Sequence, residues 1–583
     1  MQHPWCKVRL DQSELTNHDF NRPTFGQAPP VHPGATGELS VKANCLPFSH
    51  IPHTTRLFTD LLAYAPQVQP FYPRSPRFGE WLRSEAASIS YDSYRRERVS
   101  LILERQNQSW NASAKALANL DRLRQGAAAV VTGQQVGLFG GPVFSIYKAL
   151  TAVKLAEEAT AAGIDAVPIF WLATYDHDLA EVNHVSLPGP EGRIETLTTP
   201  SHGVPGSPVS AVRFGQEIAP VVEQAVALLG DSVPVQFLQD AYCSGETLGS
   251  AFARLYARVF ADWGVILLDA SDAELARLSV PIYRAGVERA GELSSALLRR
   301  GEGLEKAGYH QQVKVTASSV LLFTERQGVR AAIHRHEEAG ATEEFVIDGE
   351  AAAEKLSSAE LISEIEAHPE QFSPNVLLRP VLEDFLLPTL AYTGGAAEAA
   401  YFGQAGAVYE ALLGRITPIV PRFSATIVEP KIERLLERHR LPIAAVFEGP
   451  ESLHGQIAAG SLPADLQAAF DSAAQSFDSN FSVVKEKLEL LDRTLVDAAE
   501  TSRSKIQHQL EKLRSQAARA EAQKSEVVNR HADLLSDALY PHKGLQERTI
   551  GAMYFLARYG LDFVHQLHDL IQSDCHDHQI IEL

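Results

Sequence analysis

Four short apolar runs along the chain each end in a polar or glycine-rich segment. They cover residues 127–131, 167–173, 265–268 and 389–392. A strand covered by helices on both faces carries continuous apolar residues, whereas a strand with one solvated face alternates. The four runs therefore predict buried strands of a parallel sheet.

The segment between the first two runs has the spacing of a helix. From Val143 the apolar residues recur at Ile146, Leu150 and Val153, and Pro142 suits a first helical turn. A strand, a helix and a second strand of this length form a parallel crossover. We therefore predict an α/β fold built on a parallel sheet.

Two stretches interrupt this pattern and predict connecting insertions. Residues 292–372 contain alternating runs such as VKVTASSVLLFTER, which indicate a partly antiparallel subdomain, and residues 188–240 form a smaller insertion. The core is then divided into residues 41–187, 241–291 and 373–455, preceded by an N-terminal arm over residues 1–40.

The later part of the chain changes to a helical composition. Residues 464–540 contain no glycine or proline, and apolar residues recur in helical steps, for example at Leu488, Leu491 and Leu495. This pattern predicts a long helix or an antiparallel helical pair, so we place a helical coiled coil at 456–540. A C-terminal segment, 541–583, follows and packs near the core. Dimerisation and an intrachain hairpin both remain open, because small residues occupy several seam positions.

Composition narrows the class of partner. The chain has 583 residues, 45% of them apolar, and a net charge of −20, which disfavours nucleic acid and favours small-molecule substrates. We expect a cytoplasmic protein that does not bind membranes, because neither a charged-then-apolar leader nor an apolar run near twenty residues is present. The cysteines are far apart in sequence, which argues against a disulfide framework or a zinc knuckle; they are Cys6, Cys45, Cys243 and Cys575.

A glycine-rich corner follows the first strand. In an open parallel sheet, ligands bind beyond the carboxyl ends of the strands. Glycines there let the backbone approach a ligand, and glutamines offer neutral donors and acceptors. A purely structural turn is the alternative, and neither the GxGxxG fingerprint nor a GK[ST] phosphate loop is present. The candidate binding residues are Thr132, Gly133, Gln134, Gln135, Gly137, Gly140 and Gly141.

An acidic triplet follows the second strand at the same predicted rim. It consists of Asp176, His177 and Asp178, with Asn183 and His184 downstream. Neighbouring carboxylates raise each other's proton affinity, which favours general-base chemistry near neutral pH. The alternative is a solvated turn with a helix cap. We expect no metal, because the spacing matches no standard site.

Other residues of the rim offer charges for an anionic or cationic substrate. Lys148 and Arg379 are candidate partners for a carboxylate or a phosphate, and each could equally form an ordinary ion pair. Gly394, Gly395 and Glu398 follow the fourth apolar run and complete the candidate substrate or nucleotide site.

Two further groups lie near the end of the chain. Lys543, Gln546 and Arg548 lie at a turn that precedes a helix. This turn is either an anion-binding site or a helix start with exposed charges. The tail CHDH, residues 575–578, has metal-like residue types but irregular spacing, so we assign it no role.

The longest motifs resemble one family. Residues 130–158 (VVTGQQVGLFGGPVFSIYKALTAVKLAEE), 167–185 (VPIFWLATYDHDLAEVNHV), 373–402 and 541–560 together resemble the cysteine ligases of bacillithiol synthesis, the BshC family. The resemblance implies a Rossmann-like core with two connecting insertions, similar to class I aminoacyl-tRNA synthetases. It also implies a coiled-coil domain through which the protein forms a homodimer.

The reaction implied by this resemblance joins the carboxyl group of L-cysteine to the amine of glucosaminyl malate, giving bacillithiol. Asp176 and Asp178, helped by His177, would hold and deprotonate the ammonium group, and the malate end would lie toward Lys148 or Arg379. Gln134, Gln135 and the glycines would hold the carboxyl group and its adenylate. ATP or ADP is the implied cofactor, and Lys543, Gln546 and Arg548 are its secondary site.

The chain also departs from the implied pattern. The HxGH-type and KMSKS motifs of class I synthetases are absent, and the loop at 394–398 reads GGAAE where relatives have GGPGE. Two other functions therefore stay open. One is a non-catalytic dimeric scaffold that binds a nucleotide or metabolite, and the other is an amino-acid ligase or nucleotidyl transferase with a different acceptor.

Overall fold

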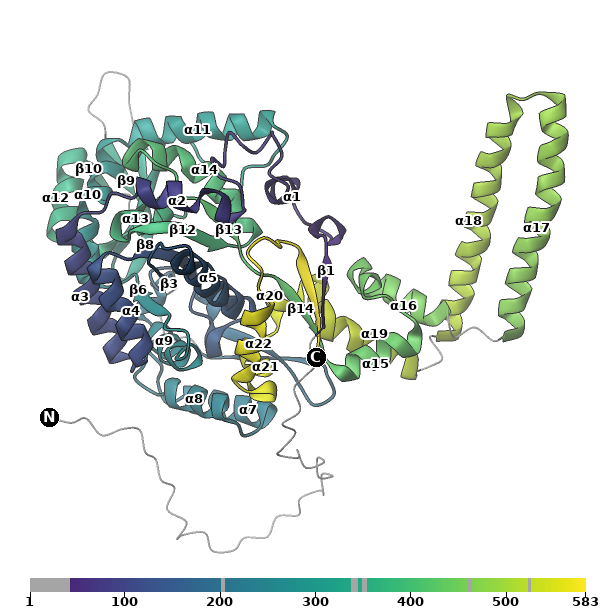
Figure 1. The fold of residues 1–583 in the computed structure, drawn as a ribbon, viewed down its shortest axis with the longest axis horizontal. Helices are drawn as coiled ribbons and strands as arrows, with labels where there is room; N and C mark the ends of the chain where they lie inside the picture. Colours follow the sequence, from purple (N-terminus) through teal and green to yellow (C-terminus); the bar gives the residue numbers. More distant parts are fainter. Residues whose placement is uncertain (1–41, 201–204, 337–343, 349–353, 460–463, 523–525) are drawn as a thin grey trace, which may run out of the picture.

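A five-stranded parallel sheet forms the centre of the molecule (Figure 1). The computed structural model describes residues 42–200, 205–336, 344–348, 354–459, 464–522 and 526–583, so the predicted arm at 1–40 and Cys6 lie outside the described residues. The strand order is β13-β12-β2-β3-β6, and every pairing is parallel. The strands are β2 (Ala128–Gln134), β3 (Ala166–Leu172), β6 (Ile266–Asp269), β12 (Thr389–Gly394) and β13 (Ile419–Pro421). The predicted α/β class is confirmed.

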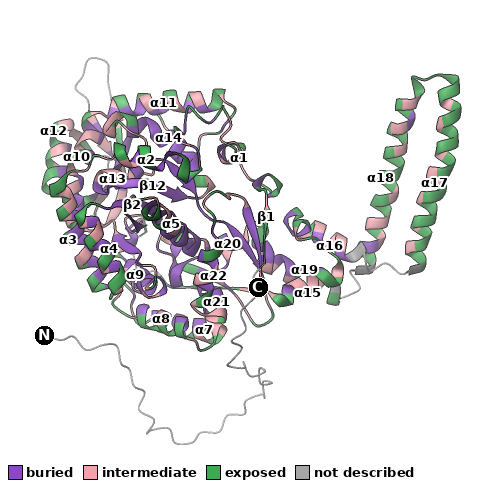
Figure 2. Cartoon of the chain, in the orientation of Figure 1, coloured by how far each residue is buried: buried purple, intermediate pink, exposed green. Residues whose placement is uncertain are grey.

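The sheet is buried on both faces, as its continuous apolar runs require. Along β3, Ile169 and Trp171 join one hydrophobic core, whereas Phe170 and Leu172 join a second core on the opposite face. Helix α5 (Phe144–Ala161) packs on β2 and β3. Helices α3 (Ser93–Ser109) and α4 (Ala114–Gln125) pack on β6. Figure 2 shows β2 and β12 at the centre of the molecule in the colour of buried residues.

The insertions carry antiparallel strands. At the start of the first is the hairpin of β4 (His184–Pro188) and β5 (Ile194–Thr198), so β4 lies before the predicted bound at residue 188. The second contributes most of a sheet with the order β10-β9-β8-β7-β11, in which all pairings are antiparallel. Its strands are β7 (Ser319–Arg326), β8 (Val329–His336), β9 (Glu344–Ile347), β10 (Glu354–Ser357) and β11 (Phe372–Pro374).

The remaining helices surround these sheets. They are α1 (Arg56–Leu62), α2 (Phe78–Ser88), α6 (Leu179–Val182), α7 (Ile218–Leu229), α8 (Val233–Ala241), α9 (Leu248–Val259), α10 (Ala273–Glu288), α11 (Ala290–Lys306), α12 (Ser358–Ala367), α13 (Arg379–Leu386), α14 (Ala396–Leu413), α15 (Pro430–His439), α16 (Pro450–Ala459), α19 (Glu526–Leu539), α20 (Gln546–Thr549), α21 (Ala552–Tyr559) and α22 (Asp562–Leu570). Among the described helices none is long and apolar enough to cross a membrane.

The coiled-coil region is a helical hairpin that projects from the rest of the molecule (Figure 1). Helices α17 (Ala464–Leu491) and α18 (Leu495–Ala522) pack against each other within one chain. Lys485 pairs with Glu500 across the hairpin, and Arg503 Nε lies 3.0 Å from Asp478 Oδ1. The predicted antiparallel helical pair is therefore present.

A third sheet joins the two ends of the described chain. Strand β15 (His578–Glu582) lies between β1 (Lys42–Leu46) and β14 (Ala425–Val428). It pairs with β1 antiparallel and with β14 in parallel. The C-terminal tail thus belongs to the core of the fold.

Candidate functional site

The glycine corner after β2 is buried and closed by other parts of the chain. A Cβ atom at Gly133 would lie 3.2 Å from the Trp171 carbonyl oxygen, and one at Gly137 would lie 2.8 Å from Gly141 Cα. Gly140 has a φ of +86°. Its N–H donates to the Tyr242 hydroxyl at 3.1 Å. These glycines therefore shape the turn, whereas Gln134 and Gln135 are the partly exposed residues of the corner.

Side chains from the corner and from the acidic triplet meet at neighbouring strand ends. The Gln135 amide donates to Asp176 Oδ2 and to Glu181 Oε2, each at 2.8 Å. The backbone N–H of His177 donates to Asp176 Oδ1 at 2.8 Å. The two predicted segments thus form one polar site at the carboxyl end of the sheet.

An arginine from the second insertion completes the surroundings of Asp176. Arg330 lies on β8, and its Nη1 is 3.7 Å from Asp176 Oδ1 and 3.3 Å from His177 Nδ1. Its other guanidinium nitrogens donate to Ser373 Oγ at 3.0 Å and to the Pro374 carbonyl at 2.9 Å. Arg330 is thereby fixed in place, with only 8% of its side chain exposed.

The surroundings of Asp176 lower its proton affinity, contrary to the expectation from the triplet. Burial acts to raise the pKa of Asp176, but the hydrogen bond from Gln135 and the charge of Arg330 outweigh it, so the pKa lies below its ordinary value. The prediction of a raised proton affinity is wrong for this residue, because its nearest partners are donors and a cation. Asp178 and His184 are exposed, and His184 Nδ1 lies 3.0 Å from the Ala180 carbonyl.

Lys148 is buried under the corner and has three partners. Its ammonium group donates to the Gly133 carbonyl at 2.6 Å, to Gln134 Oε1 at 2.9 Å and to Glu398 Oε2 at 2.7 Å. Burial lowers the pKa of Lys148 to about 8, although Glu398 opposes this. An ammonium group has three N–H donors. All three are used within the protein, so Lys148 fixes the corner and offers no spare donor to a substrate.

Glu398 ties the loop after β12 to the same corner. It accepts hydrogen bonds from the Tyr392 hydroxyl at 2.7 Å and from the Gly395 N–H at 2.8 Å, in addition to Lys148. A Cβ atom at Gly394 would lie 2.9 Å from Glu398 Cβ. The Thr132 hydroxyl donates to the Thr393 carbonyl at 2.9 Å. Thr132 and the residues of this loop therefore hold β2 and β12 together.

A buried cluster of polar side chains lies beside this corner. Arg379 pairs with Glu383 at 3.7 Å between Nε and Oε1, and its guanidinium donates to the Tyr401 hydroxyl. Neither carboxylate oxygen of Glu383 has a hydrogen-bond partner among the described residues, and the same holds for Arg379 Nε and the Tyr175 hydroxyl. Burial raises the pKa of Glu383 to about 8, with Arg379 opposing. Unsatisfied buried groups of this kind mark a place for a polar ligand or water.

The predicted secondary nucleotide residues do not come together. Lys543 is exposed and pairs with Glu451 at 3.0 Å. Gln546 is buried, where it bonds the N–H and the carbonyl of Ile427, each at 2.8 Å. Arg548 lies near the start of α5, with its guanidinium 5.8 Å from the centre of the Phe144 ring.

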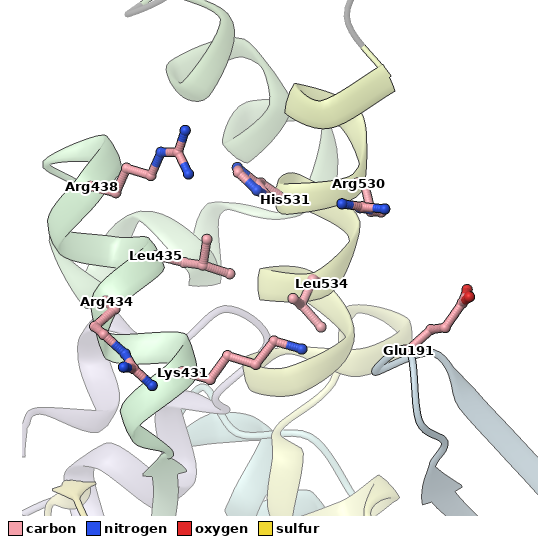
Figure 3. A pocket seen from close by; sticks show the side chains of 8 residues that line it. All are labelled: Glu191, Lys431, Arg434, Leu435, Arg438, Arg530, His531 and Leu534. Carbon is pink, nitrogen blue, oxygen red and sulfur yellow. The ribbon is translucent and has the colours of Figure 1, made fainter. Parts of the chain in front are cut away.

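A basic pocket lies instead between α15 and α19, where the helical region meets the rest of the chain. Figure 3 shows Lys431 and Arg438 pointing from α15 toward α19 and His531 pointing from α19 toward α15, with Glu191 on the β4–β5 turn at the edge. The cavity measures about 440 Å³ and is lined by Glu191, Lys431, Arg434, Leu435, Arg438, Arg530, His531 and Leu534. Lys431, Arg434 and Arg438 are spaced for one face of a helix, which is the sequence signal that identifies this surface.

The described residues contain no group of three or more His, Cys, Asp or Glu side chains arranged to hold a metal ion. His177 and Asp176 lie 3.5 Å apart, but no third ligand joins them in this part of the structure.

Comparison with known proteins agrees with the predicted family. The family described as "Bacillithiol biosynthesis BshC, N-terminal Rossmann-like domain" matches residues 41–423, and "Bacillithiol biosynthesis BshC, C-terminal coiled-coil domain" matches residues 425–583.

Relatives named "Putative cysteine ligase BshC" match over nearly their whole length. The protein of Koribacter versatilis is 47% identical over 540 residues, which is 93% of this chain and 99% of the relative. The protein of Solibacter usitatus is 34% identical over 554 residues, with 92% and 99% covered. The protein of Salinibacter ruber is 31% identical over 541 residues, with 90% and 96% covered. The chain, with its Rossmann-like core and its coiled-coil domain, therefore belongs to the BshC family of bacillithiol biosynthesis.

Proposed function

We propose that the protein is an enzyme that joins the carboxyl group of L-cysteine to the amine of glucosaminyl malate, giving bacillithiol. The names of its relatives support a cysteine ligase. The observation that carries the proposal is the hydrogen bond from Gln135 to Asp176, because it brings a neutral amide and an ionised carboxylate to one end of the sheet. The ionised carboxylate suits an ammonium group, and the neighbouring Gln134 suits a carboxyl group, because both N–H donors of Gln135 are already taken by Asp176 and Glu181.

The acidic side of the site receives the amine. Asp176 is ionised at neutral pH because its pKa is lowered, so it acts as the counter-ion of the substrate ammonium. Asp178 and His177 are exposed next to it and are the groups that take the proton from the ammonium. The free amine then attacks the activated carboxyl carbon, a carbon–nitrogen bond forms and the leaving group departs.

The malate end lies toward the buried polar cluster of Arg379 and Glu383. Arg379 keeps a buried N–H without a hydrogen-bond partner among the described groups, which suits a substrate carboxylate. Lys148 is the weaker choice because its three donors already have partners in the protein.

Activation of the cysteine carboxylate requires a leaving group, since a carboxylate anion is a poor electrophile. ATP is the proposed source, through an adenylate held near Gln134 and Gln135. A second nucleotide site is proposed in the basic pocket of α15 and α19, whose lining includes four cationic side chains and one carboxylate, that of Glu191. This location replaces the one based on Lys543, Gln546 and Arg548.

The helical hairpin is the proposed site of homodimerisation. It exposes large apolar side chains that a free helical pair would normally cover. These are Val483, Val484, Leu490, Leu491, Leu495, Ile506 and Leu513. The proposed enzyme works in the cytoplasm, where its small-molecule substrates are found.

The test is a reaction with purified protein, L-cysteine, glucosaminyl malate and ATP, followed by mass detection of bacillithiol and of the nucleotide product. Formation of bacillithiol together with AMP is expected if the activated intermediate is an adenylate. Formation of bacillithiol together with ADP would show that the intermediate is an acyl phosphate. No bacillithiol would reject the ligase in favour of a non-catalytic scaffold, and cysteine joined to a different amine would reassign the acceptor.

A further inference from the structure

Two cysteines from opposite ends of the described chain have their sulfurs in contact. Cys45 lies on β1 and Cys575 lies in the loop that leads into β15, and their Sγ atoms are 3.3 Å apart although 530 positions separate them in sequence. Cys45 is exposed and Cys575 is half-buried. The wide spacing in sequence argues against pairing, but the antiparallel ladder of β1 and β15 brings the two residues together.

The backbone on both sides of the pair is fixed. Leu46 pairs with His578 and Cys45 with Gln579 in the β1–β15 ladder. The His578 ring is bonded on the other side to Ser424 Oγ and Thr426 Oγ1, each at 2.8 Å. A disulfide bond is about 2.05 Å long, so the sulfurs need to approach by roughly 1.3 Å, a distance that side-chain rotation supplies.

The contact affects the reactivity of Cys45. The hydrogen bond with Cys575, followed by burial and the negative charge of Asp577, raises the pKa of the Cys45 thiol to about 11. Because only a thiolate attacks a disulfide, Cys45 suits the second step, after Cys575 has reacted and their thiol–thiol hydrogen bond is gone.

We propose that Cys45 and Cys575 form a reversible disulfide by exchange with a low-molecular-weight disulfide. The Cys575 thiolate attacks one sulfur of the small disulfide, the sulfur–sulfur bond of that molecule breaks, and one small thiolate leaves. Cys45 loses its proton to solvent and attacks the Cys575 sulfur of the mixed disulfide, which releases the second small thiolate. The two cysteines lose two electrons, and the small disulfide becomes two thiols that take up the two protons.

The bond would secure an edge of the fold. Strand β1 pairs only with β15 within the described chain, so it is an edge strand of its sheet. A covalent link between β1 and the loop before β15 holds both ends in place, and reduction releases them.

The experiment uses the full chain with Cys6→Ser and Cys243→Ser, which leaves only the two cysteines of the pair. The protein is incubated with hydroxyethyl disulfide, quenched with iodoacetamide, and measured by intact mass and by peptide mapping. The expected result is the loss of two hydrogen atoms, no alkyl group, and one cross-linked peptide that contains Cys45 and Cys575. Dithiothreitol should restore two alkylatable thiols, and oxidation should raise the midpoint of thermal unfolding.

Two matched variants test the need for both thiols. With Cys45→Ser added, Cys575 should stop at a mixed disulfide with the small thiol; with Cys575→Ser added, Cys45 should likewise form only a mixed disulfide and no cross-link. Two small-thiol adducts on the protein with both cysteines, or two alkylated thiols after oxidant, would overturn the proposal. Neither the masses nor the unfolding midpoint depends on ligase activity.

Discussion

Gln135 and Asp176 are joined by a hydrogen bond of 2.8 Å across the ends of two neighbouring parallel strands. The same Gln135 amide reaches Glu181 at 2.8 Å, so one neutral side chain links two carboxylates. Because Asp176 is the more enclosed of the two acids, the bond to Asp176 sets the charge state of the site.

Replacing Gln135 with methionine removes this donor and keeps the length of the side chain. A hydrogen bond to a charged group contributes about 1.5–3 kcal/mol, so we expect kcat/KM of the proposed ligase reaction to fall by about tenfold or more. The pKa of Asp176 should rise toward its ordinary value, which moves the acidic limb of the pH–rate profile to higher pH. Glu181→Gln is the control, and an equal loss in both variants would contradict a special role for Asp176.

Glu383 should make folding stability depend on pH. Its pKa is about 8 in the folded protein against 4.5 ordinarily, so the folded state keeps a proton that the unfolded chain releases between these values. The free energy of unfolding therefore decreases as pH rises through this window, by up to about 1.4 kcal/mol per pH unit. Glu383→Gln should remove that slope in urea unfolding. Glu366→Gln, an exposed partner of Arg284, should keep it; a wild-type slope retained in Glu383→Gln would contradict the assignment.

Lys148→Met should destabilise the protein because it leaves the buried Glu398 without its cation. Breaking a buried ion pair from one side costs about 3–5 kcal/mol. The double variant Lys148→Met with Glu398→Leu should regain a large part of this loss, since it removes both charges. Urea unfolding of the three proteins tests the pair, and a double variant no more stable than the single one would show that the ion pair is not the cause.

Arg434→Gln should weaken nucleotide binding in the basic pocket. Loss of one charge-assisted contact to a phosphate corresponds to about a tenfold increase in Kd, measured by calorimetry with ADP. Lys543→Gln serves as the control because Lys543 pairs with Glu451 at the surface and does not line the pocket. An equal loss of nucleotide affinity in both variants would contradict a site confined to the pocket and would favour one that includes Lys543.

The combined change Val483→Glu and Val484→Glu should convert the proposed dimer into monomers. Both valines are about half exposed on α17, so glutamates at these positions should leave the helices of the hairpin folded. The same change places charge on the face that is proposed to contact the second copy. Sedimentation velocity measures the change, and circular dichroism checks the fold. Lys487→Gln on the same helix is the control; a double variant that sediments like the wild type would rule out this face.

The parallel strands were predictable because burial on both faces leaves a direct mark on the sequence. The first run marks the start of β2, yet the strand continues through Gly133 to Gln134, since Gly133 packs against Trp171 of β3. A glycine in a sequence looks like the end of a strand when it is in fact a place of close backbone approach.

The environment of Asp176 was not predictable from local sequence. Arg330 comes from a separate antiparallel sheet, 154 positions after Asp176, and no spacing rule connects the two residues. The neighbours in sequence predict a raised proton affinity, whereas the neighbours in space lower it. The role of Glu383 was not predictable for a related reason. The segment RPVLEDFLL has the pattern of an ordinary amphipathic helix, and only the structure shows that Glu383 is buried.

The position of β15 has a consequence for biosynthesis. β1 emerges from the ribosome among the first elements of the described chain, and β14 follows well before the end, but both pair only with residues 578–582. Their sheet can therefore assemble only after residues 578–582 have left the exit tunnel. A nascent chain that stalls before this point would carry two strands with exposed edges, so synthesis of β15 is the step that closes the sheet.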